Sequence, residues 1–232
     1  MSVLFCCLAK NHGEIVPAVP TLVHYTPALA VGFTSLARAG VVLGAESEAV
    51  ATSLLAAGIS KVFVGEAALR NAGVVDRLLK RFGAARLGLH VPVQRQAVSW
   101  SFDTRSNADF RVVTPSLCEP AWEVLEADGA PSGIRANEWI DAMLQRGVQS
   151  VLLRADMGDD TDLNLCAGMV ETLGSKLWIA PLHDPAPAIA DWISYGQVTQ
   201  LALPDALYRR RHELLPHTNN AGTATLTAEQ RT

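Results

Sequence analysis

The sequence lacks the features that mark several large classes of protein. Its 232 residues include four cysteines, and none of them forms a C-x-x-C pair, which excludes a disulfide framework and a zinc-finger ligand pattern. The first apolar run is too short for a signal peptide, and no stretch reaches the roughly 18 apolar residues that span a bilayer. We therefore expect a soluble cytoplasmic protein with reduced thiols and no membrane partner.

Positive charge is also scarce. The chain has 19 Lys and Arg against 23 Asp and Glu, so it lacks the basic excess of a nucleic-acid-binding surface. The one basic run, Arg209-Arg210-Arg211, suits the last turn of a helix. Hydrophobic residues make up 49% of the chain, which supports one sizeable core. We expect a single domain over residues 1–216 and a disordered tail over residues 217–232, where little can be buried.

Short apolar runs alternate with amphipathic stretches through most of the chain. Strands are expected at residues 3–8, 40–44, 59–65, 86–91, 150–153, 177–179 and 200–203. Helices are expected at residues 28–39, 46–57, 71–82, 137–146, 163–173, 186–195 and 206–215. The clearest helix places Val74, Leu78 and Phe82 on one face, with Arg77 and Arg81 opposite. Strands that alternate with helices at this spacing are typical of a parallel sheet or barrel.

The alternation is interrupted between residues 97 and 125. Three segments alternate apolar and polar side chains there, and turn residues at 103–107 and 128–129 separate them. This pattern predicts an inserted antiparallel element after the fifth strand. Its aromatic side chains either pack the insert on the domain or form an interface with a second copy or another protein; they are Trp100, Phe102, Phe110 and Trp122.

The segment from Gly44 to Leu89 resembles the third-to-fifth strand region of the HisA/HisF family of histidine biosynthesis. The run Leu54–Gly65, with the sequence LLAAGISKVFVG, carries most of this resemblance. Asp156 with Asp159-Asp160-Thr161 is similar to the family's T-D-x-x-x-D-G-T loop, and Ala206-Leu207-Tyr208 to its A-L-Y turn. The resemblance implies an α/β fold, the TIM (β/α)8 barrel. It also implies a barrel that is distorted, shortened or incomplete near strand two, where only residues 21–24 are available.

The family's substrate carries two phosphates, each held by a Gly-rich loop and a helix N-terminus. In place of the Gly-rich loops this chain has Gly44-Ala45-Glu46 and Ala180-Pro181-Leu182. In place of the helix-start motifs it has Gly65-Glu66 and Pro204-Asp205. A carboxylate repels a phosphate in a shared pocket. The departure from the family pattern implies that the diphosphate substrate does not bind, and we expect Glu66 and Asp205 to cap their own helices.

The catalytic positions of the family are altered as well. The first strand runs into Cys6–Gly13 without the family's carboxylate, and the fifth strand has His90 in place of an aspartate. His90 could transfer protons near neutral pH, or it could be a core histidine bonded to a backbone carbonyl. Asp156 keeps a family-like acid, which could act as acid or base or could bond the loop at residues 159–161.

Further polar residues and glycines fall at the expected carboxyl ends of the strands, where barrel enzymes bind their substrates. The substrate-binding candidates are Lys10, His12, Gly44, Gly65 and His183. The two that follow the first strand could equally form a polar turn. His90, Asp156, His183 and Asp184 could surround a metal, but their spacing is not diagnostic, and we expect no metal and no other cofactor. A nucleophilic role for Cys6 or Cys7 would need an activated thiolate.

Two functions remain open at this stage. The first is a binding or scaffold protein with a degenerate active site and a role outside histidine biosynthesis. Similar relatives occur in organisms that make methanopterin-type cofactors, so we expect a context in one-carbon cofactor biosynthesis. The alternative is an isomerase or lyase of the Amadori type that acts on a sugar-derived or aromatic intermediate through His90 and Asp156. An open polar pocket at the strand ends favours an enzyme, and a filled mouth favours a scaffold with a partner at residues 97–125.

Overall fold

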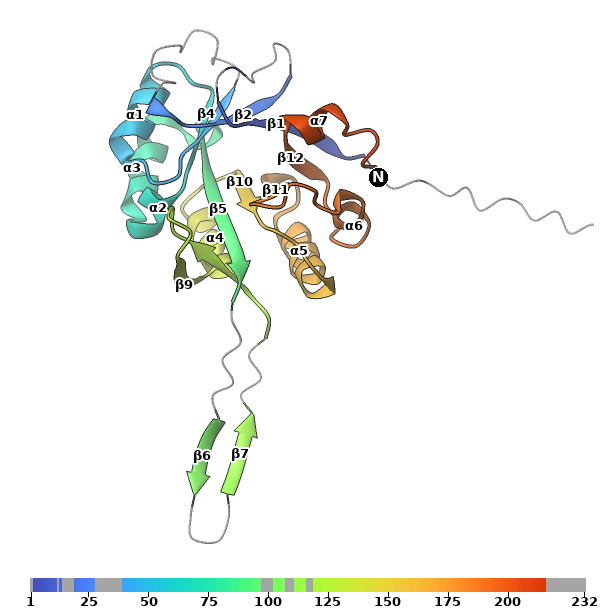
Figure 1. Cartoon of the computed structure of the whole chain (residues 1–232). Coiled ribbons are helices and arrows are strands. Elements are labelled where there is room, and N and C mark those ends of the chain that lie inside the picture. The colour runs from blue at the N-terminus through green and yellow to red at the C-terminus, as the bar shows by residue number, and fades with distance from the viewer. Residues whose placement is uncertain are drawn as a thin grey trace, which may run out of the picture.

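A computed structural model describes residues 2–11, 13, 19–27, 39–96 and 119–215, and the backbone of residues 102–106 and 111–115. Eight parallel strands close into a ring, because β12 pairs with β1 at one junction and β5 pairs with β10 at another (Figure 1). They are β1 (Leu4–Ala9), β2 (Thr21–His24), β3 (Gly40–Val42), β4 (Lys61–Val64), β5 (Leu87–Arg95), β10 (Val151–Arg154), β11 (Leu177–Ala180) and β12 (Gln200–Pro204). The predicted TIM barrel is confirmed.

The second strand is short but complete enough to close the barrel. Leu22 lies opposite Leu8 of β1, and His24 lies opposite Val42 of β3, so β2 is hydrogen-bonded on both sides. The expectation of a strand shortened to residues 21–24 is therefore confirmed, and the alternative of an incomplete barrel is wrong, because three residue pairs join β2 to the neighbouring strand on each side. The helix expected at residues 28–39 and the tail at residues 217–232 lie outside the described residues, apart from Ala39.

Helices surround the ring, as Figure 1 shows. They are α1 (Glu48–Ala56), α2 (Glu66–Arg70), α3 (Gly73–Phe82), α4 (Ala136–Gln145), α5 (Asp160–Leu173), α6 (Ile189–Ser194) and α7 (Asp205–Arg209), with 3-10 turns η4 (Ala84–Arg86) and η5 (Gly174–Lys176). All were expected except α2, whose single turn shows no helical period. The last helix is shorter than expected, because turns replace it from Arg210 onward. None of the described helices is long and apolar enough to cross a membrane.

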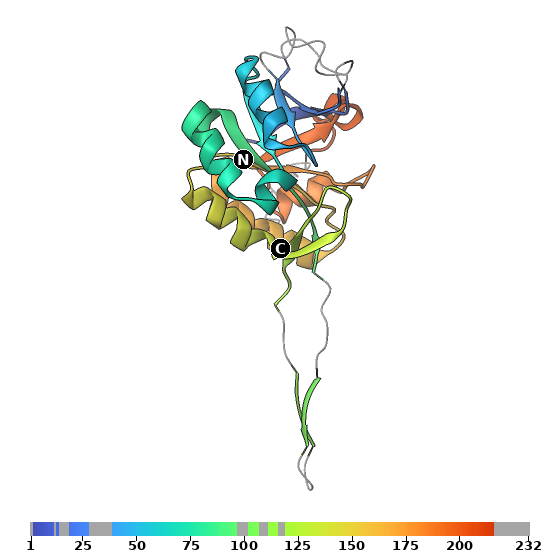
Figure 2. The same cartoon turned by 90° about the vertical axis from the view of Figure 1, so that its left-hand side faces the viewer.

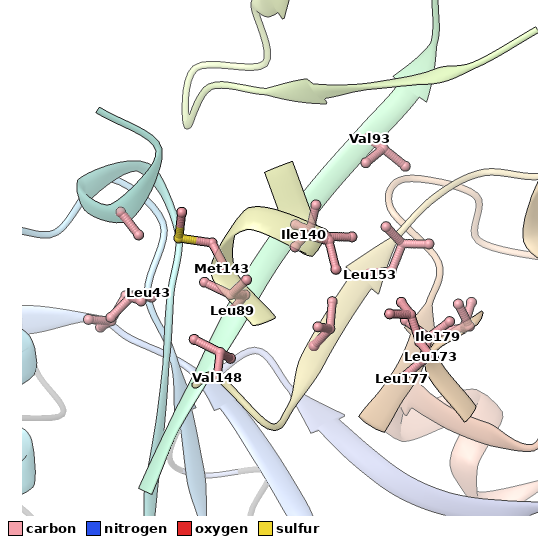
Figure 3. Close-up of a cluster of buried hydrophobic side chains, with 14 of the residues drawn as sticks. Leu43, Leu89, Val93, Ile140, Met143, Val148, Leu153, Leu173, Leu177 and Ile179 are labelled. Carbon is pink, nitrogen blue, oxygen red and sulfur yellow. The ribbon is translucent and has the colours of Figure 1, made fainter. Parts of the chain in front are cut away.

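The core has two layers, one on each side of the ring. The larger layer lies between strands and helices, and Figure 3 shows a part of it where Ile140 and Met143 of α4 lie near Leu89 of β5. The smaller layer fills the inside of the barrel, and its members are Cys6, Leu8, Val42, Phe63, Leu152, Ala180 and Ala202. The inward-facing side chains thus form a packed plug and not a pore.

Two glycines make room for this plug. A Cβ atom added to Gly88 would lie 2.5 Å from Cδ1 of Phe63, and one added to Gly40 would lie 2.6 Å from Cδ2 of Leu22. Neither distance is possible for real atoms, so the absence of a side chain at both positions lets Phe63 and Leu22 enter the barrel. The interior is therefore filled below the level of His24 and His90.

The predicted antiparallel insert is confirmed, but its expected end at residue 125 is wrong. Strand β8 (Trp122–Leu125) extends the sheet beside β5, and β9 (Pro131–Arg135) then pairs with β8. Strand β9 was not predicted from the sequence, because its residues are mostly exposed and only Ile134 among them is strongly apolar. A separate two-stranded ribbon of β6 (Phe102–Ser106) and β7 (Arg111–Pro115) projects away from the barrel (Figure 2).

Candidate functional site

A cavity of about 400 Å³ opens at the carboxyl ends of the barrel strands. His24 and Arg154 line it from the ends of β2 and β10, Pro92 lines it from within β5, and Gly44 and Gly65 line it from the loops after β3 and β4. The β8–β9 hairpin forms a further wall over residues 124–129. This end of a TIM barrel is where such folds bind ligands, and the volume falls in the usual range for small-molecule pockets.

His90 and His24 form the floor of the cavity together with Arg154. The two imidazole rings meet edge to face, with their centroids 6.2 Å apart. Nδ1 of His90 lies 2.9 Å from the carbonyl oxygen of Leu43. Nε2 of His90 is buried and has no hydrogen-bond partner among the described residues. The expected bond of His90 to a backbone carbonyl is therefore present, and one ring nitrogen is left over.

Both histidines are neutral at pH 7. Burial, together with smaller contributions from the nearby Arg154 and His24, lowers the pKa of His90 to about 3. Burial and the same guanidinium lower the pKa of His24 to about 4. Because a neutral imidazole has one N–H, and Nδ1 of His90 must donate to the Leu43 carbonyl, Nε2 is a bare acceptor.

Arg154 supplies the positive charge of the floor. Its Nη2 donates to the carbonyl oxygen of Leu182 at 2.7 Å, and Nε and Nη2 both lie 3.2 Å from the carbonyl oxygen of Pro181. Burial lowers the pKa of Arg154, although Asp156 raises it, and arginine remains charged in proteins. Within the described parts of the chain, no carboxylate forms an ion pair with this guanidinium.

Asp156 is bound to the loop that follows β11. Its Oδ1 accepts hydrogen bonds from the backbone N–H groups of Leu182, His183 and Asp184 at 2.9, 2.9 and 3.0 Å. Partial burial raises its pKa, but the amides of Asp184, His183 and Leu182 outweigh burial, so the net pKa lies below the usual range. The expected bond to residues 159–161 is wrong, because Asp159 itself caps α5 there.

The other loops also use their carboxylates internally. Oε2 of Glu46 accepts the backbone N–H of Gly44 at 2.6 Å. Glu66 forms an ion pair with Arg70 and accepts the backbone N–H of Ala127 in the β8–β9 turn at 3.0 Å. Asp205 pairs with Arg209 at 2.9 Å. The prediction that Glu66 and Asp205 cap their helices is wrong, because an arginine one turn away attracts each carboxylate and neither helix has a side-chain cap.

The predicted site residues are only partly brought together. Gly44, Gly65, His90 and His183 line the cavity, whereas Lys10 is exposed and outside its lining. His12 lies outside the described residues. Asp156 lines a neighbouring hollow with His183, so it does not share the floor with His90.

Two other candidate chemistries of the sequence find no support in the arrangement. Among the residues with described side chains, no three His, Cys, Asp or Glu groups gather as a metal site requires. Cys6 and Cys7 are buried, and burial raises the pKa of the Cys6 thiol, which disfavours the thiolate form that a nucleophile needs.

Sequence reasoning missed His24 and Arg154. Both end a strand, and both follow an inward apolar residue by two positions, namely Leu22 and Leu152. A polar residue at the carboxyl end of a barrel strand is the signal that would have found them.

A cluster outside the cavity fixes the β8–β9 hairpin to the barrel. Nη2 of Arg95 lies 2.5 Å from both Asp159 and Asp162. Nε1 of Trp122 also donates to Asp162, at 3.2 Å. The cluster therefore joins the end of β5, the start of β8 and the start of α5, and it holds one wall of the cavity in place.

The comparisons with known proteins agree with this fold. Residues 37–164, more than half of the chain, match the family described as histidine biosynthesis protein. The HisF subunit of imidazole glycerol phosphate synthase from Wolinella succinogenes is 29% identical over 131 residues, which cover 56% of this chain and 43% of that relative. The match thus spans less than half the length of the relative. The family match covers β3 to the start of α5 and most of the residues of the cavity floor, so the chain belongs to the histidine biosynthesis protein family, which contains HisA and HisF.

Proposed function

We propose that this barrel binds a small ligand at its mouth, does not take a diphosphate substrate and acts outside histidine biosynthesis. The observation that carries the proposal is the hydrogen bonding of Asp156 to the amides of Leu182, His183 and Asp184. Consecutive backbone N–H groups are the device that holds phosphates in proteins. Here a carboxylate of the chain already occupies them.

The other half of the barrel supports the same conclusion. The amide of Gly44 donates to Glu46, so it is not available to an anion in the cavity. Glu66 stands at the start of α2, and Asp205 at the start of α7, so each helix N-terminus already has a negative charge. A phosphate approaching Glu66, which lines the cavity, would meet like charge, and this repulsion costs more in a cavity than in bulk water.

The open cavity argues against a closed scaffold, and by itself it suits an enzyme as well as a binding protein. Its floor carries a guanidinium and two neutral imidazoles, and its walls include Leu69, Val124 and Trp139. A mixture of apolar walls and a few convergent polar groups is typical of ligand sites. The alternative of an Amadori-type isomerase is not favoured, because Asp156 is ionised, held by the loop and separate from the floor that contains His90.

The one-carbon context is proposed from the sequence resemblance alone. Its test is genetic. Deletion of the gene is expected to impair growth on one-carbon substrates without causing a requirement for histidine. Expression in hisA or hisF deletion strains is expected not to restore growth without histidine. Restoration of growth in either strain contradicts a role outside histidine biosynthesis.

The loss of diphosphate binding has a direct test. Isothermal titration of the purified protein with a sugar bisphosphate and with pyrophosphate is expected to show no binding up to millimolar concentrations. The control is an authentic HisA protein under the same buffer. Micromolar affinity of the present chain for either compound would refute this part of the proposal.

We further propose that the β6–β7 ribbon is the contact surface for a second copy of the chain. The ribbon pairs with no other strand among the described residues, and an isolated two-stranded hairpin is only marginally stable in water. Light scattering after size exclusion is expected to give a dimer for the full chain. Replacement of residues 100–117 by a short Gly-Ser linker is expected to give a folded monomer. A full chain that is already monomeric contradicts this proposal.

A further inference from the structure

Hydrogen-bonding capacity remains unused at the floor of the cavity. His90 is 6% exposed, its Nδ1 is bonded to Leu43, and its Nε2 has no partner in the described structure. Buried polar atoms of native proteins nearly always have a partner, supplied by the protein, by water or by a ligand. Because Nε2 is the bare nitrogen, the missing partner must be a hydrogen-bond donor.

Arg154 also has unused capacity. Its bonds to Pro181 and Leu182 use Nε and Nη2, and Nη1 donates to no described residue. Nη1 therefore keeps two N–H groups, and a charged donor of this kind forms its strongest hydrogen bonds with an anion such as a carboxylate. A cation in a cavity that forms no ion pair with any described carboxylate therefore points to an anionic group on a ligand.

The strand register sets the spacing on the ligand between the donor that meets His90 and the anionic group that meets Arg154. His90 lies opposite Leu152, and Arg154 lies opposite Pro92, on the adjacent parallel strands β5 and β10. Residues two positions apart share one face of a strand, so both side chains enter the barrel mouth from neighbouring strands, one layer apart. The donor and the anionic group must therefore lie next to each other on the ligand.

We infer that the cavity binds a small organic acid with a hydroxyl or amino group beside its carboxylate. The carboxylate pairs with Arg154, and the hydroxyl or amino group donates to Nε2 of His90. This inference rests on the proposed function, namely that the mouth binds a ligand without phosphates. The rim residues Glu66, Glu126 and Asp128 are acidic and disfavour a second anionic group, so the acid carries a single negative charge.

The test uses mandelate, which joins a 2-hydroxy acid to an aromatic body that suits the wall at Trp139. Three matched compounds each remove one feature: mandelamide lacks the charge, phenylacetate lacks the hydroxyl, and O-methylmandelate keeps the oxygen without the donor. Affinities are measured on the full-length protein by NMR titration of the His90 imidazole and the Trp139 indole. One enantiomer of mandelate is expected to bind about tenfold more tightly than each matched compound, or about 1.4 kcal/mol.

Two variants assign the preference to its residues. In His90→Asn the amide nitrogen can keep the bond to Leu43, but the acceptor at Nε2 is lost, so mandelate and O-methylmandelate are expected to bind equally. In Arg154→Gln mandelate and mandelamide are expected to bind equally. The control is Asp160→Asn, an exposed charge change in α5 that is outside the cavity lining, and it is expected to keep the wild-type preference.

The outcomes separate this inference from the proposed function. If the wild-type protein binds all four compounds with equal affinity, the inference is overturned. This comparison uses the wild-type protein alone, so it does not depend on whether a variant folds. Full preference for mandelate in a folded His90→Asn protein also overturns it. In both cases the mouth still binds ligands, and the proposed function stands. If a broader set of neutral, cationic and anionic fragments leaves the His90 and Trp139 signals unchanged, both the inference and the proposed function fail.

Discussion

Nδ1 of His90 lies 2.9 Å from the carbonyl oxygen of Leu43, and this contact joins the inner face of β5 to the loop after β3. The bond fixes the ring and its tautomer, which leaves Nε2 bare at the floor of the cavity. The same histidine is thus part of the packing between two strands and part of the candidate binding site. Its charge state therefore affects both stability and binding.

Acid is expected to destabilise the protein through its buried histidines. The pKa of His90 falls to about 3 and that of His24 to about 4 on folding, against 6.5 in the unfolded chain. The unfolded state therefore binds protons first as the pH falls below 6.5. Each histidine is expected to reduce the free energy of unfolding by up to about 1.4 kcal/mol per pH unit until its folded pKa is reached.

NMR and denaturant titrations check this dependence. Both imidazoles are expected to remain neutral in the folded protein between pH 7 and pH 5. In His90→Asn the free energy of unfolding is expected to depend less steeply on pH, because the contribution of one of the two buried histidines is removed. The variant His212→Asn is the control, because His212 is exposed in the turn after α7 and lies outside the cavity lining. Folded-state titration of His90 near pH 6.5 would contradict the prediction.

The carboxylate of Asp156 is expected to stabilise the loop after β11. Asp156→Ala leaves the amides of residues 182–184 without their acceptor, and we expect the free energy of unfolding to decrease by about 1–3 kcal/mol. The folded pKa of Asp156 is lowered, so its contribution is present above the unfolded value near 3.9 and is lost as the pH falls through the folded pKa. Urea denaturation at pH 7 and at pH 3 measures both effects.

The same variant tests whether these amides can bind an anion. With the carboxylate removed, the N–H groups of residues 182–184 become free, and inorganic phosphate is expected to raise the melting temperature of Asp156→Ala more than that of the wild type. Asp160→Asn is the matched control, since it removes one negative charge from the same segment without touching the loop. Equal stabilisation of all three proteins by phosphate would show that the amides do not form an anion site.

Gly65 is expected to tolerate no side chain. A Cβ atom there would lie 2.9 Å from the carbonyl oxygen of Leu43 and 3.3 Å from Nδ1 of His90, so Gly65→Ala must displace the contact between them. We expect a loss of about 1–3 kcal/mol in the free energy of unfolding. Gly168→Ala is the control, because its Cβ meets open space in the middle of α5 and is expected to stabilise by about 1 kcal/mol. Thermal and urea unfolding of both variants decide the comparison.

The sequence predicted the ring because its strands and helices carry local patterns. The buried run Val62–Val64 and the apolar face of Val74 and Leu78 are visible over a few residues. The two elements that were not predicted lack such patterns, because α2 is one turn long and β9 is mostly exposed. The family resemblance supplied the number of strands, which local patterns alone do not determine.

The candidate site was less predictable, since its key contacts join residues far apart in the chain. Nothing near Asp156 indicates that its partners are backbone amides 26 to 28 positions later. Nearly every residue carries a backbone N–H group, so no pattern of residue types predicts which of these groups will bind the carboxylate. His90 was identified because it replaces a family aspartate. His24 and Arg154 replace no known catalytic residue, and only the closed ring brings them to the same floor.

Arg95 and Asp162 are expected to be energetically coupled, because their contact holds the β8–β9 wall of the cavity. Asp162 is 5% exposed and also accepts hydrogen bonds from Trp122 and from the backbone of Gly158. In Arg95→Met this buried carboxylate loses its cation, which is more costly than the loss of an exposed pair. Because the Arg95 side chain is 35% exposed, solvent screens part of the effect, and we expect a loss of about 2 kcal/mol.

A double-mutant cycle with Asp162→Asn measures the coupling. The double variant is expected to lose less free energy of unfolding than the sum of the losses of the two single variants, by about 1 kcal/mol or more. The reason is that removal of either charge already breaks the pair. Arg146→Met with Asp76→Asn is the matched control, because that ion pair is exposed on both sides and is expected to couple only weakly. The wall also lines the cavity, so Arg95→Met is expected to weaken mandelate binding, whereas the control pair leaves it unchanged. Strict additivity in both cycles would mean that the cluster at Asp162 does not fix the hairpin.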